Sequence, residues 1–216
     1  MLSWVPWHSH QGGAFLTLLT ATRLPDGHFM CISDRQNLRE SREGSRSIDG
    51  DKWMPVKDQP RLLWGWAGSD LVGLAISHRL DQGGFSDWEA LRSELAPRLR
   101  SLSGEYVGHA TDCLFAGWIG NVPAMLRLRA DGGMNGGISS QDEEHFVGVG
   151  EFAVDLAWKY AKQHLKAEQA ADNFRSLLKL TIYEDARLDG FEEWDIPPDG
   201  PVVRRQAVPA RKSVLE

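Results

Sequence analysis

Residues 17–33 read TLLTATRLPDGHFMCIS and contain the pattern that decides the fold. The run 14–22 and the run 28–32 are rich in apolar and β-branched residues, and Pro25-Asp26-Gly27 stands between them. Such runs favour strands, and a Pro-Asp-Gly sequence between two of them is typical of a tight turn. The segment therefore predicts an antiparallel β-hairpin.

Outward from this hairpin the chain alternates groups of strands with pairs of helices. The polar stretch 36–51 is expected to be an exposed loop or a distorted strand. Strand-like runs follow at 61–67, 111–119, 124–129 and 145–149, and 202–203 is a candidate for a last edge strand. Helical patterns lie at 71–78, from 86 onward, at 153–161 and at 171–182. This order predicts an α+β chain in which two sheets pack face to face with helices outside them.

Two of the helix predictions carry detail. In the first helix one set of residues recurs at i, i+3, i+4 and i+7 and is expected to share one face: Leu71, Leu74, Ala75 and His78. Gly83-Gly84 ends this helix. The next helix is expected to begin with Ser86 as its capping residue and Glu89 reaching back to it. Its apolar stripe is Trp88, Leu91, Leu95 and Leu102.

Composition and charge favour one domain with a sizeable core. The chain has 216 residues, of which 42% are hydrophobic and nine are tryptophan, so it carries enough apolar surface to fold without crosslinks. Its 24 Lys and Arg residues against 30 Asp and Glu residues give a formal charge of −6. Contact with nucleic-acid phosphates needs a basic face, so nucleic acid is not an expected partner.

Cysteine usage and the apolar runs indicate the compartment. Cys31 and Cys113 both lie in apolar runs and are expected to be buried thiols in a reducing compartment. Residues 1–13 lack the pattern of a secretory signal, and no stretch of about 18 consecutive apolar residues occurs. The sequence therefore predicts a cytoplasmic protein that does not span a membrane.

Four segments together resemble the proteasome-subunit family of the N-terminal-nucleophile (Ntn) hydrolases, including its simpler bacterial relative that works with a ring ATPase. Each segment is degenerate by itself, and the order and spacing carry the likeness over about residues 14–190. The four are the hairpin 17–33 with Asp34-Arg35 at its end, Lys52 upstream of the strand 64–68, the strand pair 114–118 and 124–129 with Asp131-Gly132, and the glycine-bearing junction 146–150 before a helix.

The resemblance implies a fold, a domain division and a chemistry. The expected fold is a four-layer αββα sandwich of two antiparallel sheets flanked by helix pairs. Residues 1–13 would be an N-terminal extension or propeptide-like segment, 14–196 the Ntn domain and 197–216 a C-terminal tail. By resemblance Thr17 would be the nucleophile of a threonine-type peptidase, and the charge of Lys52 would favour the alkoxide form of the Thr17 hydroxyl. Asp34 would hold Lys52 in place. Backbone amides near Gly68 would form the oxyanion hole.

The same resemblance implies partners: a homo-oligomeric ring, an unfolded polypeptide substrate and a ring ATPase. It implies no cofactor and no metal. His8 and His10 lack a third ligand at a recognised spacing, and the paired glycines at 132–133 and 136–137 lack the Lys-Ser/Thr of a phosphate loop. The histidines have no Ser or Cys partner in a known order, which sets a classical Ser-His-Asp hydrolase aside.

Two departures from active members keep alternatives open. Sixteen residues precede Thr17, so a free α-amine would require cleavage after Leu16, where processed members usually present Gly. Glu151 lies near the position of a supporting Ser. A noncatalytic proteasome-like structural subunit, which keeps its extension, is the alternative, and a small-molecule Ntn amidohydrolase with a pocket lined by Trp64 or Trp66 is the third.

Each candidate also has a purely structural interpretation. Thr17 is a β-branched residue that suits a strand, Asp34-Arg35 suits a surface turn after a strand, and Lys52 suits a solvated surface position. The three-dimensional arrangement decides between the two interpretations.

Overall fold

The computed structural model describes residues 17–24, 26–41, 44–105, 111–129, 138–139, 145–148, 166–184 and 188–209. The predicted helix at 153–161, Glu151, and His8 and His10 lie outside these residues. So does the segment that precedes Thr17.

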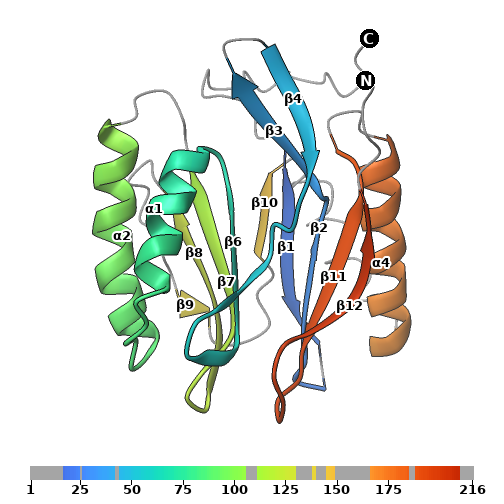
Figure 1. Ribbon diagram of the computed structural model, residues 1–216. Coiled ribbons are helices and arrows are strands. Elements are labelled where there is room, and N and C mark those ends of the chain that lie inside the picture. Colours follow the sequence, from blue (N-terminus) through green and yellow to red (C-terminus); the bar gives the residue numbers. More distant parts are fainter. Residues whose placement is uncertain are drawn as a thin grey trace, which may run out of the picture.

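Two antiparallel sheets face each other in the middle of the molecule (Figure 1). The first has five strands in the order β10-β1-β2-β11-β12. These strands are β1 (Leu18–Arg23), β2 (Phe29–Ser33), β10 (His145–Gly148), β11 (Phe191–Ile196) and β12 (Val203–Val208). The hairpin predicted from residues 17–33 forms its centre, with Thr20 paired to Ile32 and Arg23 to Phe29.

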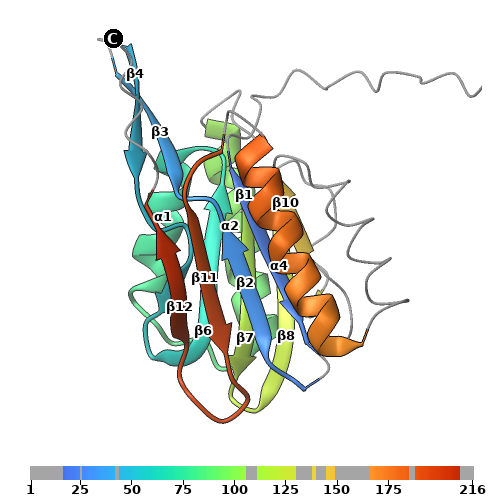
Figure 2. The ribbon, with the colours of Figure 1, turned by 90° about the vertical axis from the view of Figure 1, so that its right-hand side faces the viewer.

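The second sheet has five strands in the order β5-β6-β7-β8-β9. These are β5 (Met54–Val56), β6 (Gln59–Ala67), β7 (Asp112–Ile119), β8 (Val122–Arg129) and β9 (Ile138–Ser139). All pairings in this sheet are antiparallel. The polar stretch 36–51 forms a separate two-stranded ribbon of β3 (Gln36–Ser41) and β4 (Gly44–Asp49), which extends beyond one end of the sandwich (Figures 1 and 2).

Helices cover the outer faces of both sheets. Helices α1 (Asp70–Leu80) and α2 (Trp88–Glu105) lie on the second sheet, and α4 (Ala167–Glu184) lies on the first (Figure 1). The arrangement is an αββα sandwich, as the fold prediction requires. Within the described ranges, no helix is both long enough and apolar enough to cross a membrane.

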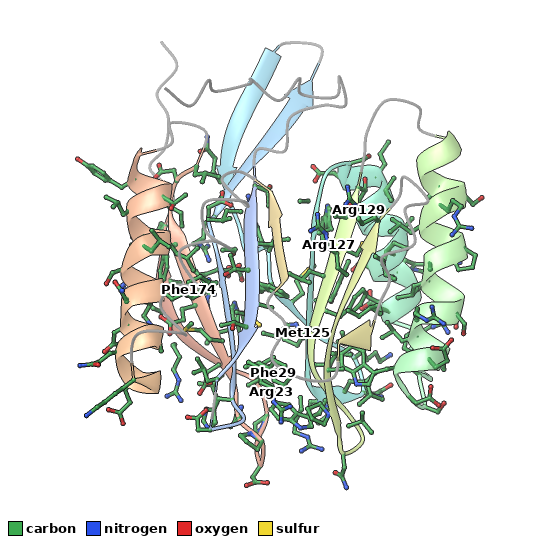
Figure 3. All side chains as sticks on the ribbon, turned by 180° about the vertical axis from the view of Figure 1, so that it is seen from behind. Arg23, Phe29, Met125, Arg127, Arg129 and Phe174 are labelled. Carbon is green, nitrogen blue, oxygen red and sulfur yellow. The ribbon has the colours of Figure 1, made fainter. Side chains whose placement is uncertain are left out.

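The buried residues form separate cores for these layers. Beneath α4, Phe174, Leu178 and Ile182 pack against β1 and β2 residues such as Leu18 and Met30. Between the two sheets, Phe29 and Met125 belong to one cluster. Figure 3 shows these two side chains in the middle layer and Phe174 against the first sheet. The helical pattern at 171–182 was predicted from apolar residues at helical spacing, Ala171, Phe174, Leu178 and Ile182, and all four are buried.

The predicted face of α1 is wrong. Leu71 and Leu74 are each 59% exposed, and the buried residues of this helix include Val72, Ile76 and Leu80. Both sets have helical spacing, so periodicity alone could not choose between them. Packing decides, because Gly73 lets the Trp66 ring approach: a Cβ on Gly73 would lie 2.1 Å from that ring.

The stripe of α2 is confirmed, but its cap is not Ser86. Trp88, Leu91 and Leu95 are buried under the helix. The amide of Ala90 donates to Asp87 Oδ1 at 2.8 Å, so Asp87 caps the helix and Ser86 only donates to Asp87 Oδ2. An Asp at the N-cap accepts the amide three residues on, as Ser86 would have done one position earlier.

Both cysteines are buried and free, as expected. Burial raises the pKa of the Cys31 thiol, and the carboxylates of Asp195 and Glu192 act in the same direction. Burial likewise raises the pKa of Cys113, with Asp112 adding to it. Both thiols are thus held in the unreactive protonated form.

Candidate functional site

Three of the four residues proposed from the sequence meet at one end of the inter-sheet layer. Thr17 directly precedes β1, Asp34 directly follows β2, and Lys52 lies two residues before β5. Lys52 Nζ lies 2.8 Å from Thr17 Oγ1. The same Nζ lies 2.8 Å from each carboxylate oxygen of Asp34. A single ammonium therefore connects a hydroxyl to a carboxylate.

Asp34 is fixed by the backbone around it. Its Oδ1 accepts a hydrogen bond from the Leu18 amide at 2.8 Å, and its Oδ2 accepts one from the Gln36 amide at 3.0 Å. The second contact is an Asx-type turn, which an Asp at the end of a strand forms readily. Because Leu18 immediately follows Thr17, Asp34 holds both Lys52 and the start of β1.

Lys52 and Asp34 form a buried ion pair. Lys52 is 4% exposed and Asp34 is fully buried. Burial lowers the pKa of the Lys52 ammonium, and the charge of Asp34 opposes this effect. Burial also raises the pKa of the Asp34 carboxyl, against the charge of Lys52 and the hydrogen bonds that it accepts. A surface turn at Asp34 and a solvated Lys52 are both excluded.

Gly65 on β6 lets this strand lie close to the Lys52 backbone, which leads into the neighbouring strand β5. A Cβ on Gly65 would lie 2.5 Å from the Lys52 carbonyl oxygen and 3.2 Å from a methyl group of Leu19. No other residue type fits without moving the backbone that carries Lys52. Sequence reasoning missed this glycine, although a Gly inside an apolar strand indicates a close approach.

Gly68 comes at the turn from β6 into α1, three residues after Gly65. It is exposed and has φ of +125°, a backbone conformation that other residues rarely adopt. The next amide, that of Ser69, donates to Thr111 Oγ1 at 3.1 Å. The amides near Gly68 remain a predicted oxyanion hole.

Sequence reasoning also missed Glu192, a fully buried carboxylate on β11 next to Lys52. Its Oε1 accepts hydrogen bonds from the Lys52 amide at 2.8 Å and the Trp53 amide at 2.9 Å. Ser33 Oγ donates to the same oxygen at 2.7 Å. The available signal was a run of three acidic residues interleaved with Phe, Trp and Ile over 191–196, since buried carboxylates are rare unless they are paired.

The two tryptophans proposed for a pocket lie elsewhere. Trp64 and Trp66 stack with ring centroids 5.2 Å apart, and Trp64 belongs to the core under α1 and α2. Leu63 and Ala67, on the opposite face of β6, belong to the inter-sheet cluster. Trp64 and Trp66 thus face the helices, whereas the site faces the other sheet.

A solved structure of a mutant form of Anbu from Hyphomicrobium sp. strain MC1 is similar to this model, with a TM-score of 0.64. The match covers 91% of this chain and 89% of that chain at 13% sequence identity. The chain shares its fold with Anbu. The likeness to Anbu supports the expected sandwich of two antiparallel sheets with helices outside them.

No family model and no curated protein matches the chain. At this level of sequence identity, the Anbu likeness is one of fold and leaves the site to be argued from its own geometry. Among the described residues, no three His, Cys, Asp or Glu side chains are grouped to hold a metal ion.

Proposed function

We propose that this proteasome-like chain is a threonine-type amide hydrolase with Thr17 as its nucleophile. The single observation that carries the proposal is the position of Lys52 Nζ, 2.8 Å from Thr17 Oγ1 and 2.8 Å from both oxygens of Asp34. A buried ion pair is weak evidence for stability, because desolvation of both charges offsets their attraction. Perturbed ionisable groups beside a nucleophile are typical of active sites.

The geometry supports a two-step acyl transfer. Thr17 Oγ1 attacks the amide carbonyl carbon while its proton passes, directly or through water, to the free α-amine of Thr17. The tetrahedral intermediate collapses, the C–N bond breaks, and that proton leaves with the amine product. Water then hydrolyses the ester on Thr17. The α-amine suits this work because its ordinary pKa of about 7.7–8.0 lies near neutrality.

Lys52 and Asp34 support this sequence without entering the covalent steps. The Lys52 ammonium lies within hydrogen-bond distance of the oxygen that becomes the alkoxide, so its charge stabilises the attacking form. Asp34 keeps the ammonium on that oxygen. Amides near Gly68 would bind the oxyanion.

The proposal requires a chain that begins at Thr17, since only then is the α-amine free. We extend the proposal to a ring of copies that hydrolyses unfolded polypeptide inside a chamber, because a lone domain would expose its nucleophile to any chain. A ring ATPase as partner follows from the family resemblance alone.

A noncatalytic proteasome-like subunit is the second candidate. It is favoured by the sixteen residues before Thr17, which place the Thr17 nitrogen in a peptide bond unless they are removed. The small-molecule hydrolase loses the feature that would have supported it, because Trp64 and Trp66 face the helices.

The deciding experiment is intact mass and N-terminal sequencing of natively expressed protein, followed by hydrolysis of a fluorogenic peptide and of unfolded casein. A mature chain that begins at Thr17 supports the hydrolase. A chain that begins at Met1 or Leu2 and hydrolyses neither substrate contradicts it and favours the noncatalytic subunit.

In the same assay, Thr17→Val should lower hydrolysis by about 10³-fold or more, because it removes the nucleophilic oxygen and keeps the β-branched shape. Thr20→Val is the matched control. Thr20 lies on β1, which Thr17 directly precedes, and its hydroxyl donates to the Ile32 carbonyl at 2.9 Å, away from Lys52. Retained hydrolysis in Thr17→Val would remove Thr17 as the nucleophile.

A further inference from the structure

The carboxylate of Glu192 reaches the Lys52 backbone from the other sheet. Besides the Lys52, Trp53 and Ser33 donors on Oε1, its Oε2 accepts a hydrogen bond from Trp194 Nε1 at 3.2 Å. Several hydrogen bonds offset the cost of burying a carboxylate. Glu192 therefore holds two consecutive amides, one of which belongs to Lys52 itself.

Two guanidinium groups balance the charge of Glu192. Arg35 Nη1 lies 3.8 Å from Glu192 Oε2, and Arg204 Nη2 lies 3.7 Å from it. Both guanidinium groups also bind Asp51, the residue before Lys52: Arg204 Nη2 lies 2.5 Å from Asp51 Oδ1, and Arg35 Nη1 contacts the same oxygen. Each residue of the segment 51–53 is thus held by at least one ion pair or hydrogen bond.

Gly65 lies close to the Lys52 backbone on the side opposite Glu192. The Lys52 amide donates to Glu192 on β11, and the Lys52 carbonyl oxygen lies where a Cβ of Gly65 on β6 would be. The peptide that carries the ammonium is therefore fixed between the two sheets. Its side chain extends toward Asp34 and Thr17.

We propose that Glu192 is a positioning residue that holds the Lys52 backbone so that Nζ reaches Thr17 Oγ1. This inference rests on the proposed function for its consequence on catalysis, but the positioning itself is independent of activity. A misplacement of about 1 Å in a catalytic group costs about 100-fold in rate, so the loss on removing Glu192 is expected to be of that order in kcat, with KM little changed.

Glu193 provides a matched control. It follows Glu192 on the same strand, is also buried, and also binds an arginine, with Arg175 Nε 2.7 Å from Glu193 Oε1. Arg175 belongs to α4, so Glu193 lies on the helix side of the sheet and away from Lys52. Glu193→Gln removes one buried negative charge of the first sheet without touching the segment 51–53.

The first readout is the titration of Lys52 itself. It is monitored by NMR of protein that contains ¹³C-labelled lysine, and the Lys52 signal is assigned by its absence in Lys52→Met. The charged groups that act on Lys52 are Asp34, Glu192 and Asp70, and all three favour the ammonium. Arg35, Arg204 and Asp51 lie around Glu192. Glu192→Gln should lower the pKa of Lys52 further, because it removes a negative charge, and Glu193→Gln should leave it unchanged.

An unchanged Lys52 titration in Glu192→Gln, or an equal shift in Glu193→Gln, overturns the proposal. If Glu192→Gln does not fold, hydrogen exchange of the unaltered protein decides instead. The Lys52 and Trp53 amides are then expected to exchange as slowly as those of the sheets. Exchange as fast as in the exposed turn 57–58 overturns the positioning role.

Catalysis is measured separately in the same variants. A protein with no hydrolytic activity contradicts the proposed function and leaves the titration and the exchange rates to decide on Glu192. The protein could be active and Glu192→Gln could keep its kcat although the pKa of Lys52 is lowered. That result overturns the catalytic consequence of the positioning.

Discussion

The two ends of the ladder between β2 and β11 have opposite chemistry, although they belong to the same pair of strands. At one end Phe29 pairs with Ile196, and at the other Ser33 pairs with Glu192. Phe29 packs edge-on against Trp118, with ring centroids 4.7 Å apart and planes at 86°. Four residues further along β2, the layer holds carboxylates and an ammonium.

This difference separates stability from function. Burial of apolar area stabilises the Phe29 end by about 25 cal/mol per Å². Burial of Lys52, Asp34 and Glu192 carries a desolvation cost that hydrogen bonds and ion pairs only offset. A protein selected for stability alone would have an apolar layer at both ends, so the polar end agrees with the proposed function.

The largest expected effect is that of Lys52→Met at the polar end. Hydrolysis should fall by about 10³-fold, because the charge next to Thr17 Oγ1 is lost. The free energy of unfolding should fall by about 3–5 kcal/mol, because Asp34 is left buried without its partner. Activity assays and urea unfolding measure the two effects.

The double variant Lys52→Met with Asp34→Asn is the control for that prediction. It removes both charges, so it should recover most of the stability and none of the activity. A double variant as unstable as Lys52→Met would show that the loss comes from packing and not from an unpaired charge.

Phe29→Ala tests the apolar end. It should lower the free energy of unfolding by about 3–5 kcal/mol, the usual cost of removing a buried Phe, since Phe29 is 1% exposed. The activity per folded molecule should stay within about twofold of the unaltered protein, because the change is remote from Thr17. A large loss of activity in the folded fraction would contradict the separation of the two ends.

The smallest expected effect is the contribution of Asp34 and Lys52 to the pH dependence of stability. The pKa of Asp34 is raised from 3.8, so the folded state binds more protons just above pH 3.8 and stability falls there as pH rises. The pKa of Lys52 is lowered from 10.5, so the unfolded state binds more protons just below pH 10.5 and stability rises there as pH rises.

Urea unfolding at several pH values measures both slopes. The difference between the unaltered protein and the Lys52→Met, Asp34→Asn double variant should show them. The difference between the unaltered protein and Phe29→Ala should not change with pH. Parallel pH profiles for the double variant and the unaltered protein would contradict the cited pKa directions.

Residue patterns predicted the parts of this molecule that depend on neighbours in sequence. The hairpin 17–33, the strands β6 to β8 and the buried face of the last helix follow from local composition and period. The buried face of α1 could not be predicted in this way, because two sets of its residues have helical spacing. Packing of the Trp66 ring against Gly73 decides which set is buried. The cap of α2 was placed one residue early for a similar reason: Ser86 and Asp87 are both good caps.

The site shows the same division. Resemblance in order and spacing was enough to propose Thr17, Asp34 and Lys52, and the structure brings those three within hydrogen-bond distance. It gave no indication of Glu192, 140 residues away from Lys52 in sequence. The resemblance also gave no indication that Gly65 lies against the Lys52 backbone. Acidic residues in a strand and a Gly in an apolar strand mark these two positions locally, but neither pattern identifies a partner far away in sequence.

Residue patterns alone predicted the central hairpin, the strands β6 to β8 and the alternation of strands with helices, because propensity and period act over short stretches of chain. They did not predict β11, which carries Glu192, and Thr17 was proposed from the family resemblance. The tertiary structure was needed to decide which face of α1 is buried and that Lys52 is desolvated beside Asp34. It alone also placed Lys52 between a carboxylate of one sheet and a glycine of the other. These properties arise when two sheets pack, since burial and charge pairing depend on residues that the chain brings together only on folding.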